Sequence, residues 1–367
     1  MARIDLDLAH AYGPNPQTDA DYALLPLKMT FRDGGAYALL GPSGCGKTTM
    51  LNIISGLVTP SQGSVMFDGK DVTRLSPQGR NIAQVFQFPV IYDTMTVAQN
   101  LAFPLRNRKV PADQISKRVG EIAEMLEMSG QLDQRAAGLS ADAKQKISLG
   151  RGLVRPDVSA VLFDEPLTVI DPHLKWQLRR KLKQIHNELK LTLIYVTHDQ
   201  VEALTFAEEV VVMSRGRAVQ VGSPDALFES PTHTFVGHFI GSPGMNFLPA
   251  RVDGAQLTVA DQIVPGGSPR DGLPAGALKL GIRPEYISLV APGSTGSLAA
   301  SVERVQDVGT YSLVTARIGS HELKARLSID DRVPGVGEHV ALRVAGPHTC
   351  FYQDEKLVTP TETASVA

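Results

Sequence analysis

The sequence of 367 residues predicts an α/β domain built on a parallel sheet, followed by a smaller all-β domain. The first observation is the stretch 36–49, in which a buried strand, a glycine-rich turn and a helix start follow one another. Strands and helices then alternate as far as about Gly222, as they do in parallel sheets. Past about Gly244 only short alternating runs remain, separated by glycine and proline turns, which is typical of a small barrel.

The glycine-rich turn has the composition of a phosphate-binding loop. Its glycines let the backbone curl with N–H groups pointing inward, and the helix that follows adds the positive end of its dipole. Lys47 supplies a cation for the β- and γ-phosphates, and the Thr48 hydroxyl is placed to bind Mg²⁺. An ordinary glycine-rich turn is the alternative, and the flanking strand and helix argue against it. We therefore expect a nucleoside triphosphate at Gly41, Pro42, Ser43, Gly44, Cys45, Gly46, Lys47, Thr48 and Thr49.

Composition narrows the class of protein. The formal net charge is −2 and 20% of residues are charged, so there is no electrostatic reason to expect nucleic acid as the main partner. Cys45 and Cys350 lie far apart in the chain, which favours a reducing cytosol over a disulfide framework. We see no signal peptide and no apolar run long enough to cross a bilayer, so we expect membrane work only through a partner.

Periodicity predicts where the elements lie. Residues up to about Asp33 indicate antiparallel edge strands, and Asp68-Gly69 indicates a hairpin turn. Apolar residues at helical spacing predict helices over about 47–57 and 111–128, the second of which begins a helical insertion that runs to Ser140. Short apolar strands are expected at 82–86, 160–163 and 193–196.

Polar side chains follow two of these strands. Asp164 comes at the end of the strand 160–163, where it would hold Mg²⁺, and Glu165 is placed to direct a water at the γ-phosphate. His198 follows the strand 193–196 and could orient the same water, although a lone histidine at a strand end leaves that role open. Because the carboxyl ends of parallel strands share one edge of a sheet, we expect these groups around one nucleotide rather than as solvated strand ends.

Two tyrosines compete for contact with the base of the nucleotide. Tyr12, beside Gly13-Pro14, could lie flat against an adenine, and Tyr22 is the alternative. Spacing alone does not separate this role of Tyr12 from that of an ordinary aromatic residue in a surface turn.

Five motifs occur in the order found in the ATPases of ABC transporters, which the chain resembles from about residue 4 to 240. In that family they are the Walker A motif, the Q-loop, the Walker B motif with its catalytic glutamate, the D-loop and the switch histidine. Here they are residues 41–49, Gln87, residues 162–166, Asp171 and residues 195–203. The resemblance implies that Glu165 and His198 are catalytic, that Thr48, Gln87 and Asp164 hold Mg²⁺, and that Tyr12 stacks on adenine. It also implies that Gln87 links the nucleotide to the membrane subunits.

Residues 239–248 and 281–285 resemble the hinge and C-terminal domain of carbohydrate importer ATPases of the maltose and glycerol-3-phosphate type. The resemblance implies an ATPase domain over 1–240, with a helical subdomain at about 98–155, and a regulatory β-barrel domain of OB-like (TOBE or MOP-like) modules over 241–367. It implies a peripheral subunit on the cytoplasmic face of the bacterial inner membrane. Its partners would be integral permease subunits and, indirectly, an extracytoplasmic solute-binding protein. The substrate would be a sugar or a polyol, such as glycerol or glycerol phosphate.

The signature segment departs from the family. The family has Leu-Ser-Gly-Gly-Gln, which completes the ATP site of the opposite subunit, and this chain has Leu139 followed by Ser140, Ala141, Asp142 and Ala143. A carboxylate about 6 Å from a phosphate charge, at an effective dielectric constant of about 20, is repelled by about 3 kcal/mol per unit charge. That exceeds the gain of under about 1 kcal/mol at a helix N-terminus. In the D-loop, Val169 replaces the usual asparagine.

These features order the candidate functions. The set of Lys47, Asp164, Glu165 and His198 is intact, which favours an ATP-hydrolysing enzyme over a regulatory half that only binds ATP. The altered signature favours a heterodimer with a second ATPase over a homodimer. A DNA-repair or translation ATPase is not supported, because the sequence has no second phosphate loop and no long coiled-coil insertion.

Overall fold

The protein is described from a computed structural model, which covers residues 1–168, 170–266 and 273–358. The chain forms two compact units, Met1–Pro224 and Asp225–Ala367. No helix in the described residues is both long enough and apolar enough to cross a membrane.

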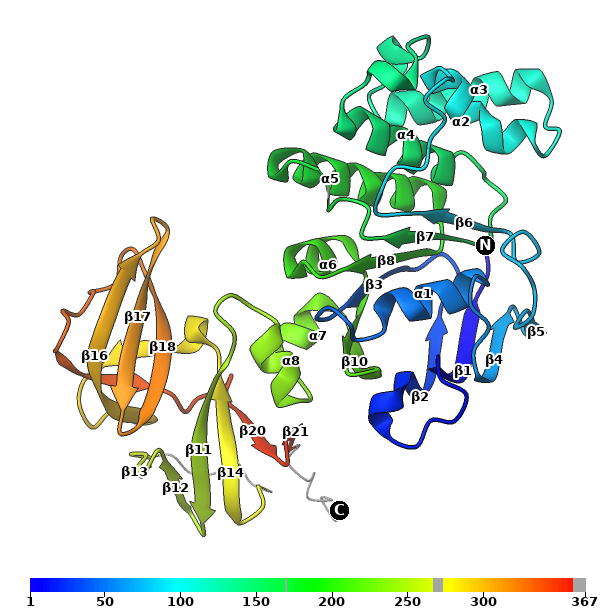
Figure 1. Cartoon of the computed structure of the whole chain (residues 1–367). Helices are drawn as coiled ribbons and strands as arrows, with labels where there is room; N and C mark the ends of the chain where they lie inside the picture. The colour runs from blue at the N-terminus through cyan, green and yellow to red at the C-terminus, as the bar shows by residue number, and fades with distance from the viewer. Residues whose placement is uncertain (169, 267–272, 359–367) are drawn as a thin grey trace, which may run out of the picture. The chain divides into compact units, whose positions relative to one another are not determined.

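The central sheet of the first unit has six strands in the order β10-β9-β3-β8-β7-β6 (Figure 1). Five of them run parallel, and β10 is antiparallel to β9. The inner strands are buried on both faces, which explains why the sequence shows them as continuous apolar runs. The strands are β3 (Ala36–Leu40), β6 (Ile82–Val85), β7 (Ala160–Asp164), β8 (Leu193–Thr197), β9 (Glu209–Ser214) and β10 (Arg217–Gly222).

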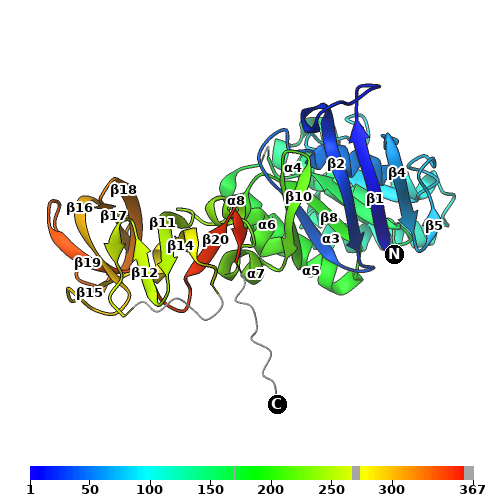
Figure 2. The same ribbon diagram turned by 90° about the horizontal axis from the view of Figure 1, so that it is seen from below.

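A second, antiparallel sheet has the order β2-β1-β4-β5, and Figure 2 shows its first three strands side by side. The predicted edge strands and the hairpin at Asp68-Gly69 are confirmed, with φ angles of 49° and 77° at the two turn residues. Helix α1 (Lys47–Ser55) lies between the two sheets and buries its apolar residues in a core to which both sheets contribute (Figure 1). The strands are β1 (Ile4–Ala11), β2 (Tyr22–Phe31), β4 (Gln62–Phe67) and β5 (Lys70–Asp71).

The remaining helices of this unit cover the central sheet or extend from it. Helices α2, α3 and α4 pack on one another, α4 packs on β6, and α6 packs on β3 and β8. The helix predicted over 111–128 is α3, which ends earlier, because Leu126 leaves the helical conformation and Glu127 adopts a φ of 58°. The helices are α2 (Val97–Arg106), α3 (Ala112–Met125), α4 (Ala141–Leu153), α5 (Pro172–Leu189) and α6 (Gln200–Phe206), with short 3-10 turns at Asp19–Asp21, Ser129–Gln131 and Ala136–Gly138.

The second unit begins with two short helices, α7 (Pro224–Glu229) and α8 (Thr234–Phe239), and continues as two antiparallel sheets. Their orders are β13-β12-β11-β14-β20-β21 and β15-β19-β16-β17-β18, and alternate residues of both fill one core. The predicted all-β domain is therefore confirmed. Its strands are β11 (Asn246–Asp253), β12 (Gln256–Val259), β13 (Gln262–Ile263), β14 (Gly276–Ile282), β15 (Ser288–Val290), β16 (Ser297–Asp307), β17 (Tyr311–Ile318), β18 (His321–Ser328), β19 (His339–Arg343), β20 (Cys350–Gln353) and β21 (Lys356–Leu357), with a 3-10 turn at Pro284–Tyr286.

One buried arginine explains why α7 and α8 belong to the second unit. The guanidinium of Arg283 donates hydrogen bonds to the carbonyl oxygens of Phe228 at 2.5 Å, Ile240 at 2.6 Å and Leu227 at 3.3 Å. It also lies over the Phe228 ring, 3.8 Å from the centroid. The carbonyl groups at the ends of both helices thus find their donors in the β domain. We predicted the division at residue 240, and in the structure the second unit begins at Asp225, the second residue of α7.

Candidate nucleotide site

The predicted site residues come together at one edge of the central sheet. The carboxyl ends of β3, β8, β7 and β6 lie side by side there, because these strands are parallel neighbours. The Thr48 hydroxyl donates to Asp164 Oδ1 at 3.3 Å, although the two residues are 116 positions apart. His198 Nδ1 lies 3.1 Å from Glu165 Oε2. The sheet order therefore gathers residues from three separate parts of the sequence.

Two glycines of the phosphate loop are required by their surroundings. Gly46 is the residue before α1 and has a φ of 104°, and a Cβ atom there would lie 2.5 Å from the carbonyl oxygen of Ala23. A Cβ atom on Gly41 would lie 2.3 Å from the carbonyl oxygen of Met213. Any larger residue would push the loop away from β2 or β9, so the close packing fixes the loop at the start of α1.

The Lys47 side chain points back toward the backbone of the phosphate loop. Lys47 is buried, and its Nζ donates to the carbonyl oxygens of Gly41 at 2.7 Å and Pro42 at 3.0 Å. It also lies 3.8 Å from the Cys45 sulfur. Burial raises the pKa of the Cys45 thiol, although the nearby Lys47 acts in the opposite direction. The thiol therefore remains protonated near neutral pH and adds no negative charge beside Lys47.

Thr48 and Asp164 form an oxygen-donor pair that fits Mg²⁺. Burial raises the pKa of the Asp164 carboxyl, the hydrogen bond from Thr48 lowers it, and the neighbouring Glu165 raises it. No group of three or more His, Cys, Asp or Glu residues among the described residues is arranged to hold a metal by itself. A hydroxyl and one carboxylate suit a Mg²⁺ ion that takes its other ligands from nucleotide phosphates and water.

Glu165 has a strained backbone and an engaged side chain. Its φ is 46°, a conformation uncommon outside glycine, and its N–H donates to the carbonyl oxygen of Val196 at 3.0 Å. The Oε2 atom accepts a hydrogen bond from the Thr168 hydroxyl at 3.3 Å and also contacts His198. Such strain is retained where the surrounding structure holds a side chain in a functional position.

The structure distinguishes the two tyrosines. Tyr12 follows β1, its side chain is 69% exposed, and its hydroxyl lies 3.1 Å from the Thr49 Oγ1 of the phosphate loop. His10 packs against the Tyr12 ring edge to face, with 4.6 Å between centroids. Tyr22 begins β2, and its hydroxyl accepts a hydrogen bond from Gln62 at 3.4 Å. Tyr12 is thus the tyrosine whose hydroxyl contacts the loop, and most of its side chain is exposed.

Gln87 lies two residues beyond β6, at the same edge of the sheet. Sequence reasoning missed the exposed apolar side chains on either side of it, which recur at alternate positions. We name Phe86, Phe88, Val90 and Tyr92 the apolar strip. Arg151 of α4 holds the end of this strip, because its Nη1 donates to the Val90 carbonyl oxygen at 2.6 Å and its guanidinium lies 4.9 Å from the Tyr92 ring centroid.

The altered signature forms the first turn of α4. Ser140 is the N-cap residue, and its hydroxyl accepts a hydrogen bond from the Ala143 N–H at 3.3 Å. The Asp142 carboxylate lies 3.8 Å from Lys146 Nζ, one turn further along the helix. Sequence reasoning missed this lysine, which the i, i+4 spacing could have revealed. The nearby cation reduces the repulsion that we expected between Asp142 and phosphate.

The D-loop residues are described in part. Asp171 is exposed ahead of α5, and its carbonyl oxygen accepts a hydrogen bond from the Lys175 N–H at 2.9 Å. Val169 lies outside the described residues.

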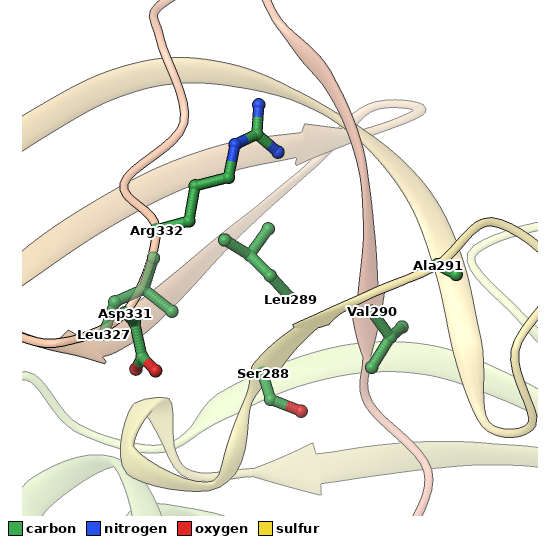
Figure 3. Close-up of a pocket in the computed structure, with 7 residues that line it drawn as sticks. All are labelled: Ser288, Leu289, Val290, Ala291, Leu327, Asp331 and Arg332. Atoms are coloured by element: carbon green, nitrogen blue, oxygen red, sulfur yellow. The ribbon is translucent and has the colours of Figure 1, made fainter.

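The second unit has a surface pocket of about 360 Å³, lined by Ser288, Leu289, Val290, Ala291, Leu327, Asp331 and Arg332 (Figure 3). In Figure 3 the Arg332 guanidinium and the Asp331 carboxylate point in opposite directions. Arg332 pairs with Glu338 at 2.5 Å, and Asp331 accepts the Ser328 N–H at 2.8 Å. The charged groups are therefore engaged elsewhere and do not converge on a ligand.

Comparison with protein families gives three matches along the chain. Residues 24–168 match the family model described as ABC transporter. Residues 241–287 match the MalK OB fold domain, and residues 280–351 match the TOBE domain.

Relatives match over most of the chain. The sn-glycerol-3-phosphate import ATP-binding protein UgpC of Burkholderia thailandensis is 39% identical over 340 residues, which cover 91% of this chain and 93% of that protein. The protein of the same name from Salmonella typhi is 39% identical over 329 residues, covering 87% and 90%. Among solved structures, cbiO1 from Clostridium perfringens, part of the ABC transporter complex cbiONQ, is 28% identical with a TM-score of 0.56, covering 62% of this chain and 90% of that one. The chain therefore belongs to the family of ABC transporter ATP-binding subunits of the carbohydrate and polyol importer type.

Proposed function

We propose that this chain hydrolyses ATP to drive import of a sugar or polyol, such as glycerol or glycerol phosphate. The observation that carries the proposal is the pair of contacts Thr48–Asp164 and Glu165–His198, both at the sheet edge that holds the phosphate loop. The UgpC relatives support the substrate class through their name, since they are import proteins for sn-glycerol 3-phosphate.

Each group has a role that follows from its position. Lys47 and the loop N–H groups bind the β- and γ-phosphates, and the exposed ring of Tyr12 stacks on adenine. Thr48, Asp164 and Gln87 would hold Mg²⁺, which would neutralise charge on the phosphates. Glu165 accepts a proton from the attacking water, and His198 orients the Glu165 carboxylate.

The assembly follows from the family. An ATPase subunit of an importer works with integral permease subunits, and we assign Gln87 and the apolar strip to that contact. The exposed apolar strip suits a contact with another protein, because four such side chains in one segment exceed the scattered exposure of an ordinary surface. The subunit would lie on the cytoplasmic face of the inner membrane as a peripheral protein. A solute-binding protein would act only through the permease, and a net charge of −2 gives no reason to add nucleic acid.

The decisive experiment is Glu165→Gln in the assembled transporter. The change preserves the size of the side chain and removes the proton acceptor, so we expect ATP binding to remain and phosphate release to fall at least about 100-fold. Glu188→Gln, on the exposed side of α5, is the matched control and should leave turnover unchanged. Unchanged turnover in Glu165→Gln with normal ATP binding would exclude the catalytic role.

The dimer is a separate proposal, which rests on the signature. The comparisons do not favour a heterodimer over a homodimer. Ser140, Ala141, Asp142 and Ala143 would face the nucleotide of the opposite subunit, together with Asp171 of the D-loop, and Asp142 would weaken that site. A partner ATPase with an unaltered signature would leave this chain's own nucleotide fully contacted. We therefore keep the heterodimer as our proposal, and rapid ATP turnover by a homodimer of this chain in the membrane complex would refute it.

The alternative function is that of a mainly non-hydrolytic, ATP-binding regulatory half of a heterodimeric ABC complex. It would apply if this chain's own nucleotide site binds ATP without hydrolysing it. Single-turnover hydrolysis by the transporter distinguishes the hydrolysing subunit from the regulatory half. Only a hydrolysing subunit would release phosphate in a way that depends on Glu165 of this chain.

A further inference from the structure

A carboxylate buried behind His198 has no role in the proposed chemistry. Glu202 of α6 is 4% exposed. Its Oε2 atom accepts hydrogen bonds from the Thr197 hydroxyl at 2.7 Å and the Tyr195 hydroxyl at 3.1 Å. A buried carboxylate is costly unless such donors compensate it, so its presence at this position calls for a specific explanation.

Thr197 connects this carboxylate to the turn that carries His198. The Thr197 Oγ1 atom donates to Glu202 and at the same time accepts a hydrogen bond from the Asp199 N–H at 3.0 Å. The Asp199 carboxylate in turn accepts the N–H groups of Val201 at 2.8 Å and Glu202 at 3.2 Å, and so caps α6. The residues before and after His198 are both fixed by this network, whereas the His198 side chain itself is exposed.

The same carboxylate faces the beginning of α5. Glu202 Oε1 lies 3.7 Å from Lys175 Nζ, and the Lys175 N–H donates to the Asp171 carbonyl oxygen. The Glu202 carboxylate thus contacts two hydroxyl groups of β8 and the ammonium group of a lysine in α5. Burial and the nearby Glu202 raise the pKa of the Tyr195 hydroxyl well above its ordinary value. Tyr195 therefore stays protonated and donates its hydrogen bond to Glu202.

We propose that Glu202 is a positioning residue: through Thr197 it holds the turn that places His198 against Glu165, and through Lys175 it ties that turn to the start of α5. This inference depends on the proposed role of His198. A purely structural carboxylate would contribute to stability alone, whereas a positioning residue affects turnover through His198 and leaves ATP binding intact.

The test uses Thr197→Val in the assembled transporter, because valine has nearly the shape of threonine and lacks the bridging hydroxyl. We expect turnover to fall about tenfold or more, as a small displacement of a catalytic group does, with ATP affinity within about twofold of the parent. Thr205→Val is the matched control, since the Thr205 hydroxyl donates to the Val201 carbonyl oxygen within α6 and does not reach β8. It should leave turnover unchanged.

Two further variants make the result specific. Glu202→Leu removes the oxygen that accepts the Thr197 hydrogen bond and should lower turnover as Thr197→Val does. Glu202→Gln keeps an acceptor oxygen for Thr197 and should retain most of the parental turnover. In a His198→Ala background, Thr197→Val should change turnover by less than about twofold, because residues that act as one unit are not additive.

The outcomes separate the two proposals. Parental turnover in both Thr197→Val and Glu202→Leu, or an undiminished effect of Thr197→Val in the His198→Ala background, would overturn the positioning role and leave the role of His198 intact. Parental turnover in His198→Ala itself would overturn both. If Thr197→Val does not fold, the comparison of Glu202→Gln with Glu202→Leu decides.

Discussion

The Lys47 ammonium donates a 2.7 Å hydrogen bond to the carbonyl oxygen of Gly41, within the loop that would hold phosphate. Phosphate must replace this carbonyl contact with a charged one, and hydrogen bonds to charged groups contribute about 1.5–3 kcal/mol. We therefore predict that Lys47→Ala weakens ATP binding by about 10- to 150-fold, measured by equilibrium titration. Lys28→Ala, at an exposed ion pair with Asp7, is the control and should bind ATP as the parent does. Equal affinity in Lys47→Ala would show that the loop does not bind phosphate through this cation.

Substitutions of Tyr12 and Tyr22 should distinguish binding of the base from binding of the phosphates. Tyr12→Ala should weaken ATP binding by about 1–3 kcal/mol, the contribution of one aromatic–base stack, and should hardly change binding of inorganic tripolyphosphate. Tyr22→Ala should affect neither ligand, because the Tyr22 hydroxyl is engaged by Gln62. A selective loss of ATP binding in Tyr22→Ala would reverse the assignment.

The signature predicts a gain of function. Asp142→Gly combined with Ala141→Gly and Ala143→Gln should raise ATP turnover of the assembled transporter. Asp142→Asn alone should give part of that gain, because it removes the charge and leaves the backbone unchanged. Lys146→Met should lower turnover further, since it removes the cation that lies 3.8 Å from Asp142. If none of the three changes turnover, Asp142 does not approach a nucleotide.

Two glycines inside helices should respond to alanine with opposite signs. A Cβ atom on Gly120 of α3 meets nothing within 4 Å, so Gly120→Ala should stabilise the protein by about 0.5–1 kcal/mol. A Cβ atom on Gly150 of α4 would lie 2.4 Å from the Leu101 Cδ2 atom, so Gly150→Ala should destabilise it by about 1–3 kcal/mol. Thermal unfolding measures both, and a stabilised Gly150→Ala would show that α2 and α4 are less tightly packed than the structure indicates.

The sequence predicted the elements and the sheet edge because those depend on local patterns. Apolar runs identified β3, β7 and β8, and parallel neighbours place their carboxyl ends together whatever the details of packing. Contacts between distant side chains were not predictable in this way. The choice between Tyr12 and Tyr22 depends on the register of β1 and β2, which is irregular between Leu8 and Ala11.

The directions of side chains and the contacts at helix ends could not be predicted from the sequence either. The orientation of Lys47 depends on carbonyl groups that only the folded loop presents. Arg283 reaches carbonyl groups 43 to 56 positions earlier, so no local pattern could assign α7 and α8 to the β domain. The pairing of Asp142 with Lys146 was local and could have been found, because it needed only a helix over both residues.

Helix α1 is enclosed between two sheets, and its packing fixes the separation between them. Tyr12 extends from the sheet on one side of α1, and Asp164 ends a strand on the other side. If Tyr12 contacts the base and Asp164 the metal, as we propose, α1 lies between these two contacts. Because α1 packs against both sheets, the separation of the two contacts is fixed by the fold. We therefore expect the chain to bind ATP more tightly than an analogue whose phosphate chain is shorter or longer.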